Sequence, residues 1–153
     1  MAETLLGCVC TVEGKDRNII WRWFTDPGIR LPYPAPARAE TSRMHVADLR
    51  AAASRRGNDD ASSTLVDDLH RSSDEFARLW ERHEVAHRGS SRIYVQHASV
   101  GLITLDVEPL VIPAQDQRLH IITPTVGGTG THALAILNGL DPRVAHAHHE
   151  VVT

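Results

Sequence analysis

Two histidines and a glutamate near the middle of the chain match the H-E-x-x-H pattern of zinc hydrolases: His83, Glu84 and His87. On a helix, histidines four residues apart lie on one face, so their imidazole nitrogens can bind the same zinc ion. The glutamate beside the first histidine can then act as general base on the metal-bound water. The pattern therefore predicts metal-dependent hydrolysis, provided that a helix carries all three residues and a third protein ligand exists.

The rest of the sequence gives this zinc site little support. The extended H-E-x-x-H-x-x-G-x-x-H form fails, because Gly89 comes one residue too early and Ile93 stands where the third histidine should be. Glu108 could serve as a remote carboxylate ligand only from a predicted strand edge before Pro109, not from a second helix. We therefore expect no metal and no catalytic residues, and zinc-dependent hydrolysis remains an alternative.

The helix that would position these residues is predicted to run from Ser72 to His87. Ser72 and Glu75 have the spacing of a capping box, in which each side chain satisfies a backbone donor near the helix start. An apolar stripe with the spacing i, i+3, i+4 and i+7 follows. It consists of Phe76, Leu79, Trp80 and His83. We expect these four side chains to lie on the buried face of the helix.

Several other helices precede and follow this one. Asp16 is a suitable N-cap for a first helix that buries Trp23 and ends before a Pro-Gly pair. A long helix is predicted for residues 37–56, a shorter one for residues 61–71, and a last one for residues 131–140.

Between the central and last helices the apolar period changes from 3.6 to 2. This alternation predicts strands at residues 93–97, at residues 102–107 with an apolar continuation to 112, and at residues 119–123. The short connections favour an antiparallel meander. The sequence therefore predicts an α+β domain in which helices pack on one face of a short sheet of about three strands.

Composition narrows the class of protein. The chain has 153 residues, 42% of them hydrophobic, which suits one globular domain. A formal net charge of -3 gives no sign of a nucleic-acid partner, and no apolar run approaches the roughly 20 residues of a membrane span. Only Cys8 and Cys10 are present, and the N-terminus lacks the pattern of a signal peptide, so a cytoplasmic location is expected.

Four segments carry a resemblance to a known family. Residues 17–27 read R-N-I-I-W-R-W-F-T-D-P, and residues 73–85 read S-D-E-F-A-R-L-W-E-R-H-E-V. Residues 97–106 contain a His-x-x-Val-Gly-Leu run, and residues 113–124 close the sheet with prolines at both ends. In this order the segments resemble the ligand-binding domain of MmyB-like bacterial transcription regulators. Asp74 and Ala98 replace prolines of the family pattern.

The resemblance implies a PAS-like fold and a function in sensing. It suggests a small apolar ligand, with a fatty acid as the best guess, whose binding state is transmitted to transcription. An apolar cavity between helix and sheet would hold an acyl chain. The candidate ligand-binding residues are Trp23, Phe76, Leu79, Trp80, His83, Val95, His97, Leu105 and Ile121. No cofactor is implied, and under this interpretation H-E-x-x-H is a chance combination.

Two departures from the family pattern set further expectations. Residues 1–15 are too few to supply a helix-turn-helix, so direct DNA binding by this chain is not expected. The same residues are too few for the two strands that open family domains. We expect a poorly defined segment at residues 1–15, the PAS-like domain at residues 16–140 and a flexible tail at residues 141–153. A degenerate domain that acts as a protein-interaction surface is a further alternative, and a homodimer is a possible assembly.

Overall fold

The chain combines α-helices with a small antiparallel sheet. The computed structural model describes residues 13–57, 59–84, 89–112, 117–137 and 139. These residues form five α-helices and a three-stranded open sheet, which confirms the predicted α+β class and is consistent with a PAS-like fold. They divide into two compact units, each described by itself. Of the described residues, the helical unit holds 13–31, 35–57 and 59–84, and the sheet unit holds 32–34 and those from 89 onward.

The helical unit begins with a short 3-10 helix, η1 (Gly14–Arg17), followed by α2 (Ile19–Thr25). The N-cap of α2 is Asn18, whose Oδ1 accepts hydrogen bonds from the backbone N–H groups of residues 20 and 21. The predicted cap, Asp16, instead accepts a hydrogen bond of 3.1 Å from the indole Nε1 of Trp21. The first helix was therefore placed correctly, but its cap was assigned two residues too early.

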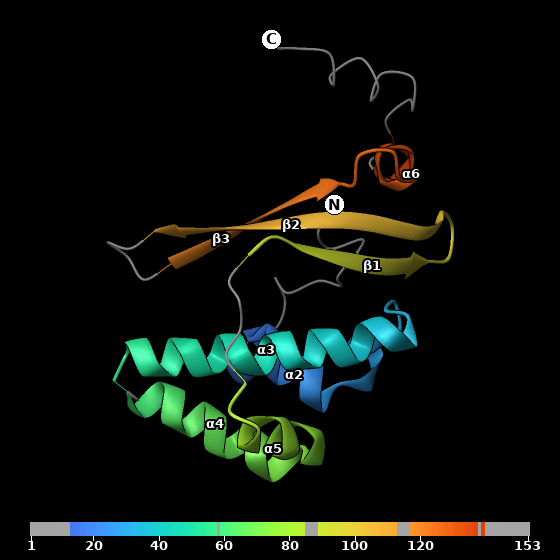
Figure 1. Cartoon of the computed structure of the whole chain (residues 1–153). Coiled ribbons are helices and arrows are strands. Elements are labelled where there is room, and N and C mark those ends of the chain that lie inside the picture. The colour runs from blue at the N-terminus through green and yellow to red at the C-terminus, as the bar shows by residue number, and fades with distance from the viewer. Residues whose placement is uncertain (1–12, 58, 85–88, 113–116, 138, 140–153) are drawn as a thin grey trace. The chain divides into compact units, whose positions relative to one another are not determined.

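Two longer helices follow. After the 3-10 helix η2 (Pro27–Arg30), α3 spans Ala35–Arg55 and α4 spans Asp60–Ser72. The two helices run in opposite directions, as Figure 1 shows. Buried residues 42, 46, 49 and 53 form a stripe along α3 with helical spacing, and the Asp59 side chain caps α4 by accepting from the N–H of residue 62. Both helices agree with the prediction within two residues at each end.

The central helix, α5 (Asp74–Glu81), is much shorter than predicted. Its N-cap is Ser73, whose Oγ accepts a hydrogen bond of 3.2 Å from the N–H of Phe76, whereas Ser72 is the last residue of α4. The helix ends at Glu81, and His83 has a φ of 51° in the left-handed region. That conformation is uncommon for a residue with a side chain and is incompatible with a continued right-handed helix. The predicted continuation to His87 is therefore wrong.

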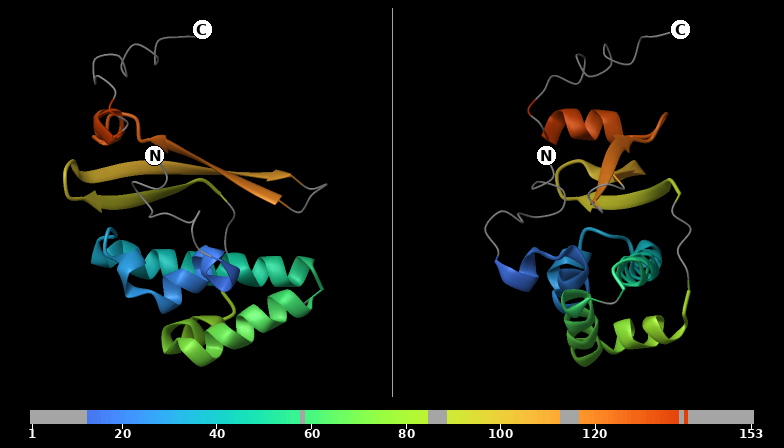
Figure 2. Two further views of the ribbon diagram at one scale, coloured as in Figure 1. Left: turned by 180° about the vertical axis from the view of Figure 1, so that it is seen from behind. Right: turned by 90° about the vertical axis from the view of Figure 1, so that its left-hand side faces the viewer.

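Every α-helix of this unit packs against at least two of the others. Helix α5 packs against both α3 and α4, and α2 packs against the same two helices. The arrangement is visible in the two further views of Figure 2. Trp23 and Phe76 are the largest fully buried side chains of the unit. Each helix thus buries one apolar face inside the unit, as its sequence period requires.

The sheet unit is an antiparallel meander of β1 (Ser91–His97), β2 (Gly101–Ile112) and β3 (Gln117–Pro124) in the order β1-β2-β3. Strand β1 pairs with β2 only as far as Val107. Pro109 lies beyond that pairing, where β2 has β3 as its one neighbour among the described strands. A proline cannot donate to a sheet hydrogen bond, so its position near an edge agrees with the prediction.

Helix α6 (Gly130–Leu137) covers one face of the sheet. We call this the α6 face; its described apolar residues are Ile93, Val95, Ile103, Leu105, Val107 and Ile122. Thr129 Oγ1 donates a 2.8 Å hydrogen bond to the carbonyl of Leu102 and so fixes the helix start. A Cβ at Gly130 would lie 2.7 Å from the backbone oxygen of Thr104. Glycine is therefore required where the helix meets the sheet.

The second face of the sheet also carries apolar side chains, but these remain partly exposed. By strand register they alternate with the residues of the α6 face. They are Tyr94, Leu102, Leu110, Ile112, Leu119 and Ile121, with exposed fractions from 40% to 54%. Ile121 was expected to line one ligand cavity together with Val95 and Leu105, which requires all three to share a face of the sheet. That expectation is wrong, because Ile121 lies opposite Glu108 and residues one position apart in a strand point to opposite faces.

Candidate ligand-binding residues

An aromatic cluster forms the centre of the helical unit. Phe76 of α5 is fully buried, and its ring meets Phe24 edge-on at a centroid distance of 5.3 Å. Trp80, one turn further along α5, stacks on Phe76 at 5.5 Å with an interplanar angle of 24°. His70 of α4 presents its ring edge-on to both, at 5.3 Å and 6.1 Å. These geometries are favourable for aromatic pairs and give the cluster a defined shape.

Arg50 of α3 completes this cluster with a cation. Its guanidinium carbon lies 4.5 Å from the ring centroid of Trp80, a cation–π contact. The same guanidinium donates hydrogen bonds to the backbone carbonyls of Trp80 and, at 3.1 Å, of Glu84. Burial lowers the pKa of Arg50, and the nearby Glu84 charge opposes that effect. Arg50 therefore holds the C-terminal end of α5, where a cation also complements the helix dipole.

A second group of contacts links the helices through buried polar atoms. The indole Nε1 of Trp23 donates a 2.9 Å hydrogen bond to Oγ of Ser42, which is fully buried. Ser42 also lies close enough to the Glu75 carboxylate to lower its pKa as a hydrogen-bond donor. Arg30 donates to the same carboxylate at 2.6 Å from Nη1, and to the Trp23 carbonyl at 2.6 Å from Nε. This polar network joins α2, η2, α3 and α5, and its polar groups serve as partners for one another.

Electrostatics of the network favour an ionised Glu75. Burial raises the pKa of this carboxyl, but hydrogen bonds from Ser42 and Arg30, with the Arg30 charge, outweigh it and leave the pKa below its ordinary value. The Glu75 side chain is 36% exposed and that of Arg30 is 20% exposed. The pair is therefore a partly buried ion pair of defined geometry rather than a loose surface contact.

The structure brings together part of the predicted site in the helical unit. Phe76 and Trp80 are in direct contact, and Leu79 beside them is half-buried. Trp23 is buried at 1% exposure and belongs to the polar network. His83 is exposed and lies beyond the end of α5, so the prediction that its ring is buried on the Phe76–Trp80 face is wrong. The left-handed backbone at this residue turns its side chain away from the helical stripe.

The same break in the helix removes the geometry that the zinc pattern requires. Helix α5 ends before His83, so His83 cannot form part of a helical i, i+4 pair of ligands. His87 lies outside the described residues. Among the residues that the structure describes, no group of three or more His, Cys, Asp or Glu side chains could hold a metal ion. The structure gives the hydrolase alternative no supporting observation.

In the sheet unit the predicted site residues divide between the two faces. Val95 and Leu105 are buried on the α6 face at 1% and 2% exposure. His97 is half-buried at the end of β1, where its Nδ1 accepts a 3.2 Å hydrogen bond from the N–H of Ser99. Ile121 is 41% exposed on the second face. Leu105 therefore belongs to the core beneath α6, Val95 is buried on the same face, and Ile121 is the one sheet residue of the set that is classed as exposed.

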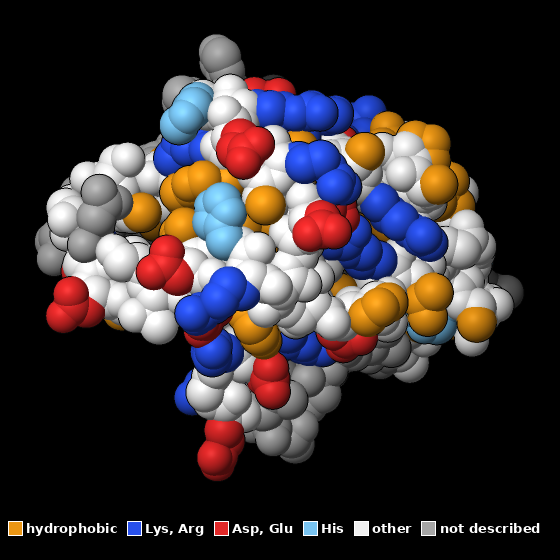
Figure 3. All heavy atoms as spheres, turned by 90° about the horizontal axis from the view of Figure 1, so that it is seen from below, with side chains coloured by type: hydrophobic (Ala, Val, Ile, Leu, Met, Phe, Trp, Pro, Cys, Tyr) orange, Lys and Arg blue, Asp and Glu red, His pale blue; other side chains and the backbone are white. Residues whose placement is uncertain are grey.

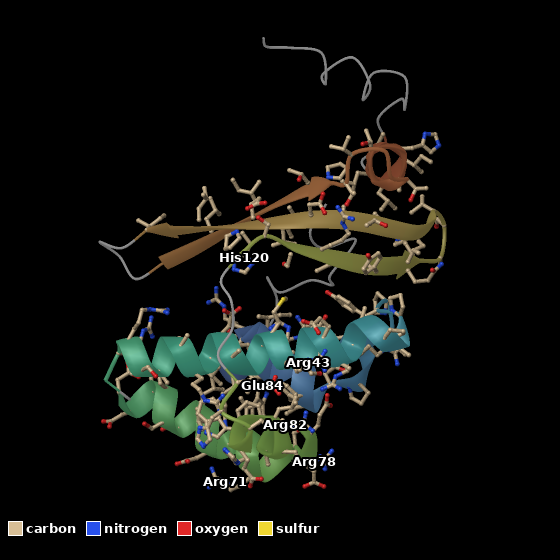
Figure 4. All side chains as sticks on the ribbon, viewed as in Figure 1. Arg43, Arg71, Arg78, Arg82, Glu84 and His120 are labelled. Atoms are coloured by element: carbon tan, nitrogen blue, oxygen red, sulfur yellow. The ribbon has the colours of Figure 1, made fainter. Side chains whose placement is uncertain are left out.

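Charged side chains on the helical unit are mixed in sign. In Figure 3, basic and acidic side chains are interspersed with apolar ones over the face turned to the viewer. Figure 4 shows Arg71 and Arg78 on this side of the unit and Arg43 on α3. Arg43 and Arg71 each pair with an acidic residue three positions earlier in the same helix. This described surface has no uninterrupted basic stripe of the kind that nucleic-acid phosphates require.

Comparison with known proteins identifies the family. The family model described as MmyB-like transcription regulator ligand binding domain matches residues 1–137. The chain belongs to this family. The matched range includes residues 1–15, which precede the first of the recognised motifs, and extends into α6. The family consists of ligand-binding domains of transcription regulators, and it is not a catalytic family. No curated protein and no solved structure is significantly similar to the chain.

One further observation concerns membrane-spanning helices. None of the described helices is both long and apolar enough to span a lipid bilayer. The longest, α3, carries charged residues along its length and has buried polar residues at Thr41 and Ser42. Within its own unit it packs against α2, α4 and α5.

Sequence reasoning missed most of the polar residues near the aromatic cluster. Glu75 was interpreted as a capping-box partner of Ser72, although it pairs with Arg30, which is 45 positions away. Ser42 and Arg50 lie on a long helix whose sequence shows only a weak separation of apolar and polar residues. A local pattern cannot reveal such partners, because the contacts depend on how separate helices pack.

Proposed function

We propose that this domain binds a small apolar ligand, with a long-chain fatty acid as the preferred class, and that the ligand controls a transcription regulator. The observation that carries the proposal is the family match over residues 1–137. That match supports ligand binding as the general function. The fatty acid is our more specific proposal, and it rests on the apolar and aromatic character of the candidate residues.

Half-buried apolar side chains of α5 support this choice of ligand. Leu79 and Trp80 are neither fully buried nor fully exposed, so part of each remains available for contact with a ligand. Trp80 has a fixed orientation because Phe76 stacks on it and Arg50 contacts its ring. A rigid aromatic surface binds an acyl chain with little loss of conformational freedom. We propose Leu79 and Trp80 as the ligand-contacting residues of the helical unit.

Tryptophan fluorescence gives a direct test, because the chain has only three tryptophans: Trp21, Trp23 and Trp80. The wild-type protein, Trp80→Phe and the matched control Trp21→Phe are titrated with dodecanoate, and the emission change is recorded. Trp21 is a suitable control because its indole bonds to Asp16 at the outer side of α2. We expect saturable binding by all three proteins, with the emission change lost in Trp80→Phe and retained in Trp21→Phe.

Two results would count against the proposal. A wild-type protein that shows no saturable change, no shift in melting temperature with dodecanoate and no lipid on solvent extraction does not bind this class. Equal emission changes in both variants would instead show that a ligand binds away from Trp80. Mass spectrometry of the extract then identifies any ligand that co-purifies.

A further inference from the structure

Arg22 of α2 differs from the other arginines of the helical unit. It is half-buried, and its Nη1 atom is fully buried without a hydrogen-bond partner. A buried cationic donor without a partner is unfavourable, because it loses its hydration and gains no protein contact in return. Such a group in a folded protein is a candidate for binding an anion that arrives with a ligand.

The neighbouring arginines show what a partnered guanidinium looks like in this unit. Arg30 pairs with the Glu75 carboxylate, and Arg50 donates to two backbone carbonyls. Arg71 pairs with Asp68 within its own helix. In each case an oxygen acceptor lies within hydrogen-bond distance of the guanidinium. Nη1 of Arg22 lacks such an acceptor even though it is shielded from solvent.

The sequence offers Arg22 a local acid, but the structure uses that acid elsewhere. Asp26 is four residues further on, the usual distance for a helical ion pair. Its Oδ1 accepts a 2.8 Å hydrogen bond from the N–H of Gly28 and caps η2. Ile19, three residues before Arg22 and therefore on the same side of α2, is 44% exposed. A guanidinium whose Nη1 has no acceptor thus shares one side of α2 with an exposed apolar side chain.

We infer that Arg22 binds the carboxylate of an amphipathic ligand, and that Ile19 contacts the apolar part next to that carboxylate. This inference rests on the proposed function and makes it more specific, since it assigns a named residue to the acid group of the ligand. A carboxylate can accept two hydrogen bonds from one guanidinium, which gives both affinity and orientation.

The test compares an acid with the corresponding alcohol. Wild-type protein, Arg22→Met and Arg22→Lys are titrated with dodecanoate and with 1-dodecanol, which has the same chain but no charge. We expect the wild type to prefer dodecanoate. Arg22→Met should weaken dodecanoate binding by about tenfold to a hundredfold, the effect of losing a charged hydrogen bond, and should leave dodecanol binding unchanged. Arg22→Lys should retain part of the preference.

Arg17→Met is the matched control, because Arg17 is an exposed arginine in η1 of the same unit. It should change neither affinity. Equal binding of acid and alcohol by the wild type, or unchanged acid binding in Arg22→Met, overturns the role of Arg22 and leaves the proposed function intact. Failure of the wild type to bind either molecule removes both the inference and the proposed function.

The melting temperature of ligand-free Arg22→Met provides a second test, because a purely structural role of Arg22 predicts the opposite change. Removing an unpartnered buried charge should leave the melting temperature of the ligand-free protein unchanged or raise it. If Arg22 instead served the fold, for example through a bridging water, Arg22→Met should lower the melting temperature in the absence of ligand. A clear decrease therefore contradicts the inference, even when ligand affinity also falls.

Discussion

The two units of this protein stabilise themselves by different means. The helical unit combines aromatic rings with a buried polar network, in which Trp23, Ser42, Glu75 and Arg30 satisfy one another. The sheet unit relies on aliphatic side chains beneath α6, chiefly Ile103 and Leu105 with Ala133 and Leu134 of the helix. Its second face leaves several large apolar side chains partly exposed.

This difference indicates where ligand recognition chemistry can reside. Directional contacts such as cation–π pairs and charged hydrogen bonds occur mainly in the helical unit, where Arg22, Arg30 and Arg50 are at least half-buried. In the sheet unit the described ion pair, between Arg92 and Asp106, is a cross-strand contact on the second face. Specificity for a charged head group is therefore expected from the helices, and nonspecific apolar contact is what the sheet can offer.

The largest expected effect comes from truncating the aromatic cluster. Phe76→Ala removes a fully buried ring that contacts Phe24, His70 and Trp80. We expect the free energy of unfolding in urea to fall by about 3–5 kcal/mol, the usual cost of such a cavity. Ile103→Val, in the core of the sheet unit, should cost only about 0.5–1.5 kcal/mol. A loss below about 1 kcal/mol for Phe76→Ala would mean that the cluster does not hold the helices together.

The next effect concerns the buried polar network. Ser42→Ala removes the acceptor of the Trp23 indole and a donor to Glu75, so it leaves buried polar atoms without partners. The free energy of unfolding should fall by about 1–3 kcal/mol. Ser54→Ala is the control on the same helix, where the side chain is exposed and the change should stay within about 0.5 kcal/mol. Equal effects of the two substitutions would contradict the network.

A smaller effect should appear as a pH dependence that belongs to the helical unit. Because the pKa of Glu75 in the folded state lies below its ordinary value of 4.5, folding favours the ionised carboxylate. Its stabilisation is fully present above pH 4.5 and is lost as the pH falls through the lower folded pKa. Melting temperatures measured across the acidic range should therefore decline less steeply for Glu75→Gln than for the wild type. Glu81→Gln, an exposed change on the same helix, should behave as the wild type.

The smallest expected effect tests the second face of the sheet. Leu119 is 54% exposed, and its replacement by serine should change the free energy of unfolding by no more than about 0.5 kcal/mol. Thermal unfolding of Leu119→Ser beside Ile103→Val provides the comparison within one sheet. A loss larger than that of Ile103→Val would show that Leu119 is covered in solution and would remove the contrast between the two faces.

Much of the secondary structure could be predicted from the sequence because it depends on local rules. Helix start and stop signals together with apolar spacing predicted α3 and α4 within two residues at each end, and alternation predicted all three strands. Pro109 was expected at an edge because proline lacks an N–H to donate, and it lies beyond the β1 pairing. The family motifs, recognised by their order along the chain, agree with the family match over residues 1–137.

The end of α5 could not be predicted, because two contacts from outside the helix contribute to it. The sequence through His83 continues the helical period, and no glycine or proline interrupts it before Gly89. In the structure, Arg50 of α3 binds the Trp80 and Glu84 carbonyls, and His83 adopts a left-handed backbone. A cation from another helix that binds these carbonyls replaces the partners that a longer helix would provide. The zinc pattern loses its helical basis for the same reason.

The sequence by itself therefore determined the class of fold, the order of the elements and the family, since each depends on periodicity, turn chemistry or motif order. Tertiary structure alone decided which polar side chains meet: Ser42 with Trp23, Arg30 with Glu75, and Arg22 with no acceptor for its Nη1. The contacts among these residues span up to 45 positions of the sequence. They depend on the packing of whole helices, and the free energy of burying a charge is fixed only when its final neighbours are known.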